Sequence, residues 1–352
     1  MHSTSPARLA INGYGRIGRC FLRALHESTA KDHFTVVAIN EPAHLESMAY
    51  LTRYDSTHGR FPAEVGLGEQ RLFIGGQPIA VSHARTPAGV DWAEHGIDLL
   101  VECSGVYGQR SELAGFLAAG CPRLLLSHPG HSADDVDATI VAGINEQTLN
   151  GEHRLVSAAS CTTNAIVPIL DLLLREVGIE QAQLSTLHSV MNDQPLIDGY
   201  HHDDLRRTRS AMQSIIPVST GLARGIERLL PQLAGRIQAK AIRVPTLNVS
   251  AIDLTILTQR PVSAHDINAL LASAAQGPLR GRLAFSDQAH ASIDFNHDPH
   301  SAIVDGSQTR CAGHHLLNLF VWFDNEWGFA NRMLDVAQHW AQHWVQHRPP
   351  NS

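Results

Sequence analysis

The sequence has little of what defines several protein classes. Its 352 residues include five cysteines, an odd number without closely spaced pairs, which argues against a disulfide framework and is typical of a reducing compartment. No apolar run reaches the length of a membrane span, and Met1–Arg8 lacks the apolar core of a signal peptide. We therefore expect a cytoplasmic protein with no membrane partner.

Positive charge is also scarce. The formal net charge is -7 and there is no long run of lysine or arginine, so an electrostatic nucleic-acid partner is not expected. The hydrophobic share of 43% and the charged share of 17% are ordinary for a globular protein. The chain is longer than most domains built around a single hydrophobic core, which predicts two domains.

Histidine, in contrast, is abundant at 22 residues, which raises the question of a metal site. His339, His343 and His347 recur at i, i+4 and i+8 in a segment with a helical pattern, and such pairs can bind zinc. No acidic partner is spaced to complete a site, so a solvated helix face is the better interpretation. We expect no metal.

The first 160 residues alternate short apolar runs with helical patterns. This alternation predicts a Rossmann-type, doubly wound parallel sheet. The expected strands are 9–12, 34–40, 97–103 and 123–127, and the expected helices are 19–27 and 112–119.

The pattern changes after Cys161. A helix is expected over 166–177, and longer, more alternating runs at 183–188, 240–244, 249–257 and 316–323 predict a mixed or antiparallel sheet. The expected organisation is an α/β chain with an NAD-binding domain over 1–160, completed by a C-terminal helix over 327–352, and an α+β catalytic domain over 161–326. The polar loop 191–214 is longer than a simple connection needs.

A glycine triplet lies between the first expected strand and helix. Gly13-x-Gly15-x-x-Gly18 in that context is the dinucleotide fingerprint, although glycine-rich turns are common. Glu41 follows the second strand, where a carboxylate can accept hydrogen bonds from the adenosine ribose and repel a 2′-phosphate. NAD is thus favoured over NADP, while a solvated loop charge remains the alternative for Glu41.

Cys161 stands in the stretch Ser160-Cys161-Thr162-Thr163-Asn164, just before an apolar helical run. Backbone N–H groups at a helix start favour negative charge, so a thiol there is biased toward the nucleophilic thiolate. A buried structural cysteine is the alternative, because free cysteine is among the most buried residue types.

Four motifs together resemble the glyceraldehyde-3-phosphate dehydrogenase superfamily: INGYGRIGR (Ile11–Arg19), SCTTN (Ser160–Asn164), RVPT (Arg243–Thr246) and DNEWGFANR (Asp324–Arg332). The resemblance covers almost the whole chain. It implies a homotetramer that binds NAD, with Cys161 as nucleophile and His188 as base. It assigns cofactor binding to Gly13, Tyr14, Gly15, Arg16, Ile17, Gly18, Glu41, Arg85 and Asn325. Ser127 is expected to bind the cofactor as well, because it follows an expected strand at the edge where open α/β sheets bind ligands. The resemblance assigns binding of a small phosphorylated aldehyde to Ser160, Thr162, Asp193, Arg206, Thr220, Gly221 and Arg243.

Within that superfamily the chain most resembles the branch that oxidises erythrose 4-phosphate. The finer likeness lies in HSVMNDQ (His188–Gln194), DLRRTR (Asp204–Arg209), QSIIPV (Gln213–Val218) and DFNHDPHSAIVDGSQTR (Asp294–Arg310). Met191 stands where glycolytic members usually offer a threonine, and Glu41 replaces their usual aspartate. This implies a thioester hydrolysed by water, in a step that feeds pyridoxal 5′-phosphate synthesis. The alternatives are a phosphorylating glycolytic enzyme and a catalytically silent nucleotide-binding regulator.

Overall fold

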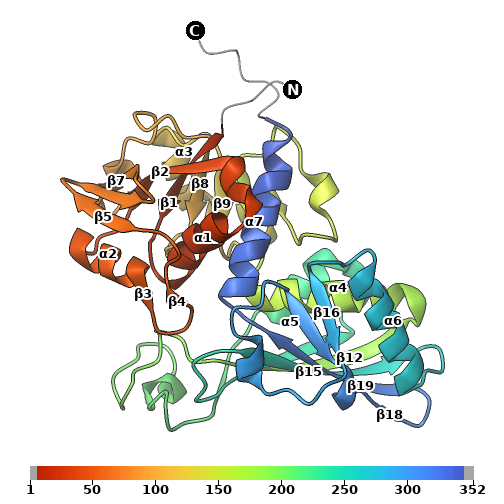
Figure 1. Ribbon diagram of the computed structural model, residues 1–352. Coiled ribbons are helices and arrows are strands. Elements are labelled where there is room, and N and C mark those ends of the chain that lie inside the picture. The colour runs from red at the N-terminus through yellow and green to blue at the C-terminus, as the bar shows by residue number, and fades with distance from the viewer. Residues whose placement is uncertain (1–5, 345–352) are drawn as a thin grey trace. The chain divides into compact units, whose positions relative to one another are not determined.

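The computed structural model describes residues 6–344 and divides them into two compact units (Figure 1). The first unit holds the described residues up to Ser160 together with those from Ala330 onward. The second unit spans Cys161–Phe329.

The first unit is built on a nine-stranded sheet whose order is β10-β11-β9-β8-β1-β2-β7-β6-β5. Neighbours from β10 to β7 pair in parallel, whereas β5, β6 and β7 form antiparallel pairs at one edge. The strands are β1 (Ala7–Asn12), β2 (Phe34–Asn40), β5 (Val65–Gly68), β6 (Arg71–Ile74), β7 (Gln77–Ser82), β8 (Leu99–Glu102), β9 (Leu124–Leu126), β10 (Ala138–Thr139) and β11 (Leu155–Ser157). A separate small hairpin pairs β3 (Tyr54–Asp55) with β4 (Gly59–Arg60).

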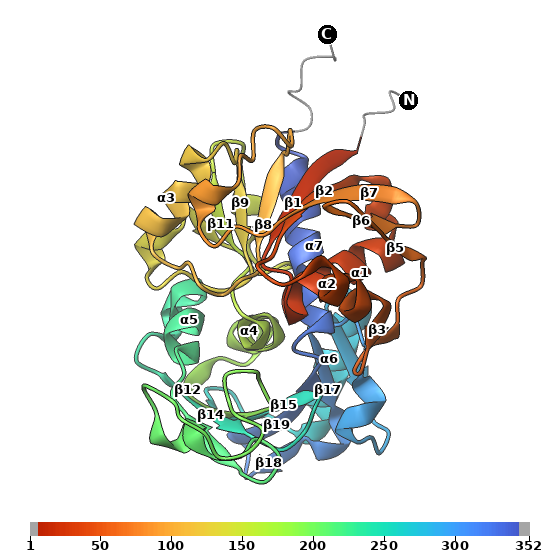
Figure 2. The same ribbon diagram turned by 90° about the vertical axis from the view of Figure 1, so that its left-hand side faces the viewer.

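Helices cover both faces of this sheet. The connections after β1 and β8 run toward opposite edges, and right-handed crossovers then place α1 (Arg16–Glu27) and α3 (Arg110–Ala118) on opposite faces. Figures 1 and 2 show α3 on the other side of the sheet from α1, with α7 (Trp327–Ala341) beside α1. The sheet order reverses at β1, and this is where open α/β sheets bind ligands.

The sequence missed the antiparallel edge of this sheet. Strands β5 and β6 have only four residues each, and β6 returns to β7 through the tight Gly75-Gly76 turn, in which both glycines have positive φ. Such short strands carry too few alternations for a reliable period. The helix α2 (Leu45–Arg53) before them was not predicted either.

The second unit contains an eight-stranded mixed sheet. The order β13-β14-β12-β15-β19-β17-β16 is completed by β18, which pairs with β19. The strands are β12 (Ile179–His188), β13 (Ile216–Val218), β14 (Ile237–Arg243), β15 (Ser250–Thr258), β16 (Leu283–Ser286), β17 (Ala302–Asp305), β18 (Arg310–Ala312) and β19 (Leu316–Phe323). The predicted mixed sheet is confirmed.

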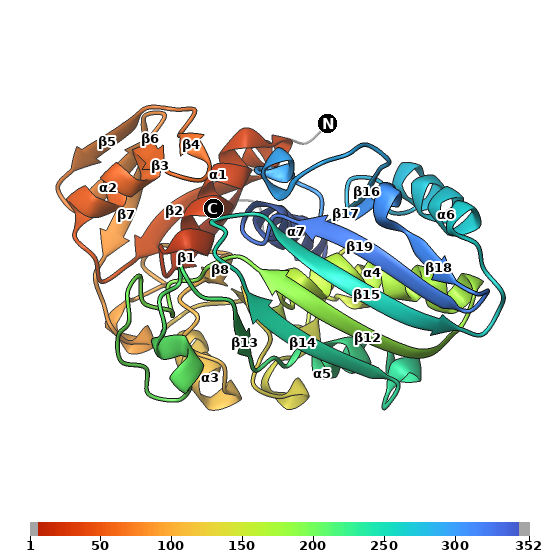
Figure 3. The same ribbon diagram turned by 90° about the horizontal axis from the view of Figure 1, so that it is seen from below.

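The helices of this unit, α4 (Cys161–Glu176), α5 (Leu222–Leu229) and α6 (Ala264–Gln276), lie on one face of the sheet, and Figure 3 shows the broad strands β12, β14, β15 and β19 from the other side. The helix α4 begins at Cys161, five residues before the predicted start at Ile166. The polar residues Thr162–Asn164 belong to its first turn.

In the described residues, no helix is both long and apolar enough to cross a membrane. The sequence predicted that His339, His343 and His347 lie on a solvated helix face, and the structure does not show full solvation for the first two. The rings of His339 and His343 lie 5.5 Å apart and the Nε2 atom of each is buried, while His347 lies outside the described residues.

Candidate active site and cofactor pocket

The glycine-rich turn follows β1 directly. Gly13 has a φ of +84°, and a side chain there would collide with the backbone of Ser104. A side chain at Gly18 would collide with the carbonyl of Gly13, whereas one at Gly15 would meet nothing within 4 Å. Two glycines are thus needed for packing within the protein, and the third leaves open space beside the start of α1.

A hollow of about 310 Å³ opens beside this turn within the first unit. Glu41 lines it, and its carboxylate accepts hydrogen bonds from the N–H of Tyr14 at 2.7 Å and of Ala43 at 3.2 Å. The exposed Arg85 also lines it, together with Tyr107, whose hydroxyl donates to the Arg85 carbonyl. The predicted residues Gly13, Gly15, Glu41 and Arg85 therefore meet at one pocket.

A buried polar network supports the floor of this hollow, and the sequence did not predict it. The carboxylate of Glu102, at the end of β8, accepts hydrogen bonds from Asn12 Nδ2 at 2.5 Å and from Ser104 N at 2.7 Å. Asn40 donates to Asn12 Oδ1 at 2.8 Å. Burial raises the pKa of Glu102, against the hydrogen bonds that it accepts. The sequence did contain a sign of this network, because Asn12, Asn40 and Glu102 each end a largely apolar strand.

The other predicted cofactor residues contribute in different ways. Arg16 and Ile17 open α1, so their backbone N–H groups lie at a helix start, which favours phosphate. The Tyr14 phenol is buried and forms a hydrogen bond with Thr52 at 2.9 Å. The contribution of Tyr14 to the turn is therefore its backbone N–H, which donates to Glu41. Ser127 follows β9, and its N–H donates to Glu102 O.

Cys161 and His188, predicted as nucleophile and base, lie together in the second unit. The Cys161 Sγ atom lies 3.9 Å from His188 Nε2 and 3.8 Å from Thr162 Oγ1. The carbonyl of Ser189 lies 2.8 Å from His188 Nδ1. A carbonyl can only accept, so Nδ1 carries the proton and the lone pair of Nε2 faces the thiol.

The electrostatics of this pair correct one expectation. The start of α4 was predicted to lower the pKa of Cys161. In the structure, burial raises the pKa of Cys161 and outweighs the opposing hydrogen bonds from the Thr162 hydroxyl and the first backbone N–H groups of α4. Burial likewise lowers the pKa of His188, against its bond to Ser189. Burial therefore disfavours the charged form of each residue on its own.

Beside this pair lies a cluster of two arginines and one carboxylate. The buried Arg243 grips Asp193 with both terminal nitrogens, and Arg207 Nη1 donates to the same carboxylate at 3.2 Å. Burial alone would raise the pKa of Asp193, but the bonds from Arg243 and the charge of Arg207 bring it below its usual range. Arg207 Nε also lies 3.9 Å from Asp204 Oδ2, so Arg207 is shared between two carboxylates. Guanidinium groups placed side by side in this way suit a phosphate.

The sequence assigned Arg206 to this cluster and missed Arg207. The side chain of Arg206 is exposed, and its backbone N–H donates to Asp204. The 3₁₀ turn Leu205–Thr208 decides which of the two adjacent arginines faces Asp193. No periodicity in the sequence encodes that choice.

The other residues predicted to bind the substrate lie at the starts of α4 and α5. Ser160 immediately precedes α4, and Thr162 contacts the thiol. Thr220 accepts a hydrogen bond from Leu222 N at 3.2 Å, and Gly221 is the N-cap of α5, which packs on α4.

Asn325 occupies the turn between β19 and α7. The buried Asp324 shapes this turn by accepting hydrogen bonds from the N–H groups of Glu326 at 3.1 Å and Trp327 at 2.8 Å. Asn325 Oδ1 lies 2.8 Å from Ser189 Oγ and 2.9 Å from Ser250 Oγ. Its carbonyl end is anchored beside the residue that also fixes His188.

Comparison with protein families agrees with this geometry. Residues 7–110 match the glyceraldehyde 3-phosphate dehydrogenase NAD-binding domain, and residues 160–325 match the C-terminal domain of the same family. The chain belongs to the glyceraldehyde-3-phosphate dehydrogenase family. It is therefore an NAD-dependent oxidoreductase, and its first unit is the NAD-binding domain.

The residues present fit NAD. The space at Gly15 leaves room for a pyrophosphate beside the first N–H groups of α1, and the Glu41 carboxylate can accept ribose hydroxyls. In a dehydrogenase of this family, the nicotinamide ring accepts the hydride.

Proposed function

We propose that this enzyme oxidises D-erythrose 4-phosphate to 4-phosphoerythronate. The supporting observation is the contact between Met191 Sδ and Arg243 Nη2 at 3.5 Å. A thioether thus stands next to the phosphate arginine, where a hydroxyl would donate a hydrogen bond to the substrate phosphate. Glycolytic members of the family usually have a threonine at the position of Met191. In this respect the chain resembles the branch that oxidises erythrose 4-phosphate.

The proposed reaction uses the residues already placed together. His188 Nε2 takes the thiol proton as Cys161 Sγ bonds to the aldehyde carbon, and it then passes this proton to the carbonyl oxygen, giving a thiohemiacetal and a neutral His188. Bound NAD would supply the hydride acceptor, and His188 Nε2 would then take the proton of the thiohemiacetal hydroxyl, so that loss of both leaves a thioester. Water then cleaves the thioester, releasing the acid and returning the thiol.

Other residues bind and orient the substrate and the cofactor in this proposal. Arg243 and Arg207 hold the substrate phosphate, with Asp193 fixing both guanidinium groups. Thr162 and Thr220 support the second anion site, and Asn325 holds the nicotinamide carboxamide. By the same likeness, the product would enter pyridoxal 5′-phosphate synthesis.

The experiment follows NADH absorbance with NAD and each aldehyde phosphate, with and without inorganic phosphate. We expect turnover of D-erythrose 4-phosphate that does not depend on phosphate. Phosphate-dependent turnover of glyceraldehyde 3-phosphate would instead support the glycolytic alternative. Met191→Thr is the matched variant, expected to gain activity on the three-carbon aldehyde. Loss of all turnover in the presence of NAD binding would favour a silent protein.

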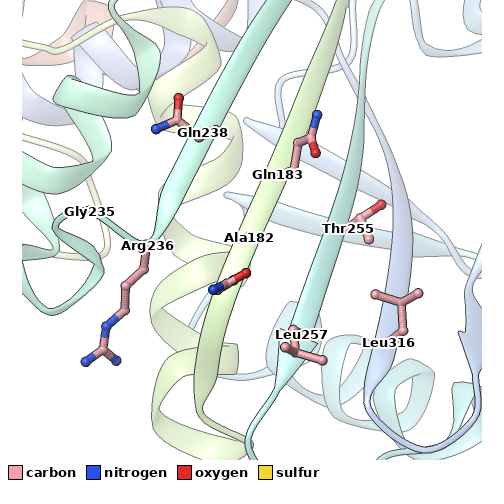
Figure 4. A pocket seen from close by; sticks show the side chains of 9 residues that line it. Ala182, Gln183, Gly235, Arg236, Gln238, Thr255, Leu257 and Leu316 are labelled. Carbon is pink, nitrogen blue, oxygen red and sulfur yellow. The ribbon is translucent and has the colours of Figure 1, made fainter.

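We also propose a homotetramer. The face of the second unit's sheet away from its helices carries a hollow of about 370 Å³, lined by Gln183, Gln238, Thr255, Leu257 and Leu316 among others (Figure 4). Such a mixed polar and apolar sheet face suits packing against a second copy. Light scattering should give a mass of about 150 kDa, four times the 38.3 kDa subunit. A mass near one subunit would refute the assembly.

A further inference from the structure

Two buried serines lie around the carbonyl end of Asn325 without taking part in the proposed chemistry. Ser189 is 1% exposed and Ser250 is 0% exposed. Their hydroxyl oxygens lie 2.8 and 2.9 Å from Asn325 Oδ1, and the backbone N–H of Ser189 donates to Ser250 Oγ at 3.0 Å. The two hydroxyl oxygens are 3.3 Å apart.

Proton counting determines which end of the Asn325 amide faces the serines. With Oδ1 between them, each hydroxyl donates to one lone pair of Oδ1, and Ser250 Oγ accepts from Ser189 N–H. In the reversed amide, Nδ2 would donate to both hydroxyl oxygens. Ser250 could then donate to Ser189, but the buried proton of Ser189 would lack an acceptor, which is costly.

The free end of the amide is therefore Nδ2. Asn325 is partly exposed, and within the described residues Nδ2 makes no hydrogen bond. We infer that Ser189 and Ser250 are positioning residues that present Asn325 to the nicotinamide as a hydrogen-bond donor, aimed at the carboxamide oxygen. The inference rests on the proposed function only through the contact between Asn325 and the nicotinamide.

Ser189 also connects this amide with the base. Its carbonyl accepts the Nδ1 proton of His188, and its hydroxyl donates to Asn325. One residue therefore fixes the tautomer of the base and the direction of the cofactor-binding amide. The backbone contact survives any side-chain replacement, so the two roles can be tested separately.

The test measures dissociation constants by calorimetry, without aldehyde, for NAD and its 3-acetylpyridine analogue. The analogue keeps the carbonyl and replaces the amide NH₂ with a methyl group. If Nδ2 donates to the carbonyl, Asn325→Ala weakens both ligands by the same factor, about 10-fold. If Oδ1 instead accepts from the NH₂ group, the variant weakens NAD alone, and the inference is overturned.

The serines are tested in the same assay. Ser189→Ala should raise both dissociation constants about 5-fold, and Ser189→Thr, which keeps the hydroxyl, should restore them. Ser263→Ala removes the N-cap of the distant helix α6, so it should lower stability and leave both constants unchanged. Unchanged constants in Ser189→Ala, or in Asn325→Ala, would overturn the inference.

Because no aldehyde is present, a wrong substrate assignment leaves this result untouched. Conversely, if the measured dissociation constants contradict the role of the serines, the turnover assay on the two aldehyde phosphates still tests the proposed function. An unchanged acid limb of the pH–rate profile in Ser189→Ala would show that the base kept its Nδ1 contact. A shifted acid limb would mean that Ser189→Ala disturbs the backbone next to His188. The Ser189→Thr variant then decides the matter: if it does not restore the dissociation constants, the positioning role of Ser189 is refuted.

Discussion

His188 and Arg243 stand opposite each other in register on the parallel strands β12 and β14. Residues paired in this way project to the same face of a sheet. The predicted base and the predicted phosphate-binding arginine are therefore placed together by one strand pairing. Burial lowers the pKa of His188, and the positive charge of Arg243 lowers it further. A base with a lowered pKa stays neutral, and so competent, at more acidic pH.

The first prediction concerns the dependence of Cys161 on His188. Replacing His188 with Asn removes the proton acceptor but keeps a polar side chain, so burial, the Thr162 hydroxyl and the helix N–H groups remain to set the pKa of Cys161. Because burial raises that pKa, the midpoint of iodoacetamide labelling against pH should lie above that of an ordinary thiol and above that of the wild type. We expect kcat to fall by about 10²- to 10⁴-fold. An unchanged midpoint would show that His188 does not activate the thiol.

The second prediction separates the roles of the glycines. Gly15→Ala meets open space in the protein, so it should fold with a nearly unchanged melting temperature. Its dissociation constant for NAD should rise about 10-fold or more, because the new methyl group occupies the space left for the pyrophosphate. Gly18→Ala should instead lower the melting temperature, because its methyl group meets the Gly13 carbonyl. Equal effects in the two variants would contradict this assignment.

The third prediction distinguishes two adjacent arginines. Arg207→Ala removes a guanidinium bound to Asp193 and should raise KM for the aldehyde phosphate about 10-fold or more. Arg206→Ala removes an exposed side chain and should have the smaller effect. Steady-state kinetics of both variants with the same substrate decide the matter. A larger effect from Arg206 would restore the sequence-based assignment.

The fourth prediction concerns stability in acid. Burial alone would raise the pKa of Asp55, but bonds from Arg16 at 2.5 Å and from the N–H groups of Thr57 and His58 lower it to about 2. A carboxylate with a lowered pKa stabilises the fold above its unfolded pKa, and this contribution is lost as pH falls toward 2. Asp55→Asn should lose about 2 kcal/mol at pH 7.

Denaturant unfolding at pH 7 and at pH 3 tests this prediction. The difference in unfolding free energy between wild type and Asp55→Asn should shrink at the lower pH. Asp266→Asn in the exposed first turn of α6 is the matched control. A constant difference between pH 7 and pH 3 would show that the carboxylate charge of Asp55 contributes nothing.

The cofactor half of this protein was the more predictable from sequence. Gly13, Gly15 and Gly18 act through their own backbone within one turn, so their spacing carries the information locally. The strand at 34–40 was predicted with the bounds that the structure shows. The buried Glu102 network was not predicted, because its partners come from three strands that are distant along the chain.

The catalytic half depended more on tertiary structure. The local sequence placed Cys161 at a helix start, but it gave the wrong direction for the pKa, since burial is a property of the folded surroundings. The choice of Arg207 over Arg206 follows from a single turn of the 191–214 loop.

By itself, the sequence determined the family and the cofactor and singled out Cys161 as the candidate nucleophile, because each rests on motifs of a few consecutive residues. Only the tertiary structure decided which side chains surround them. The contact of Cys161 with His188, the grip of Arg243 on Asp193 and the anchoring of Asn325 by two serines join residues 27 to 136 positions apart. Strand pairing and loop paths set such contacts, and no local pattern records them.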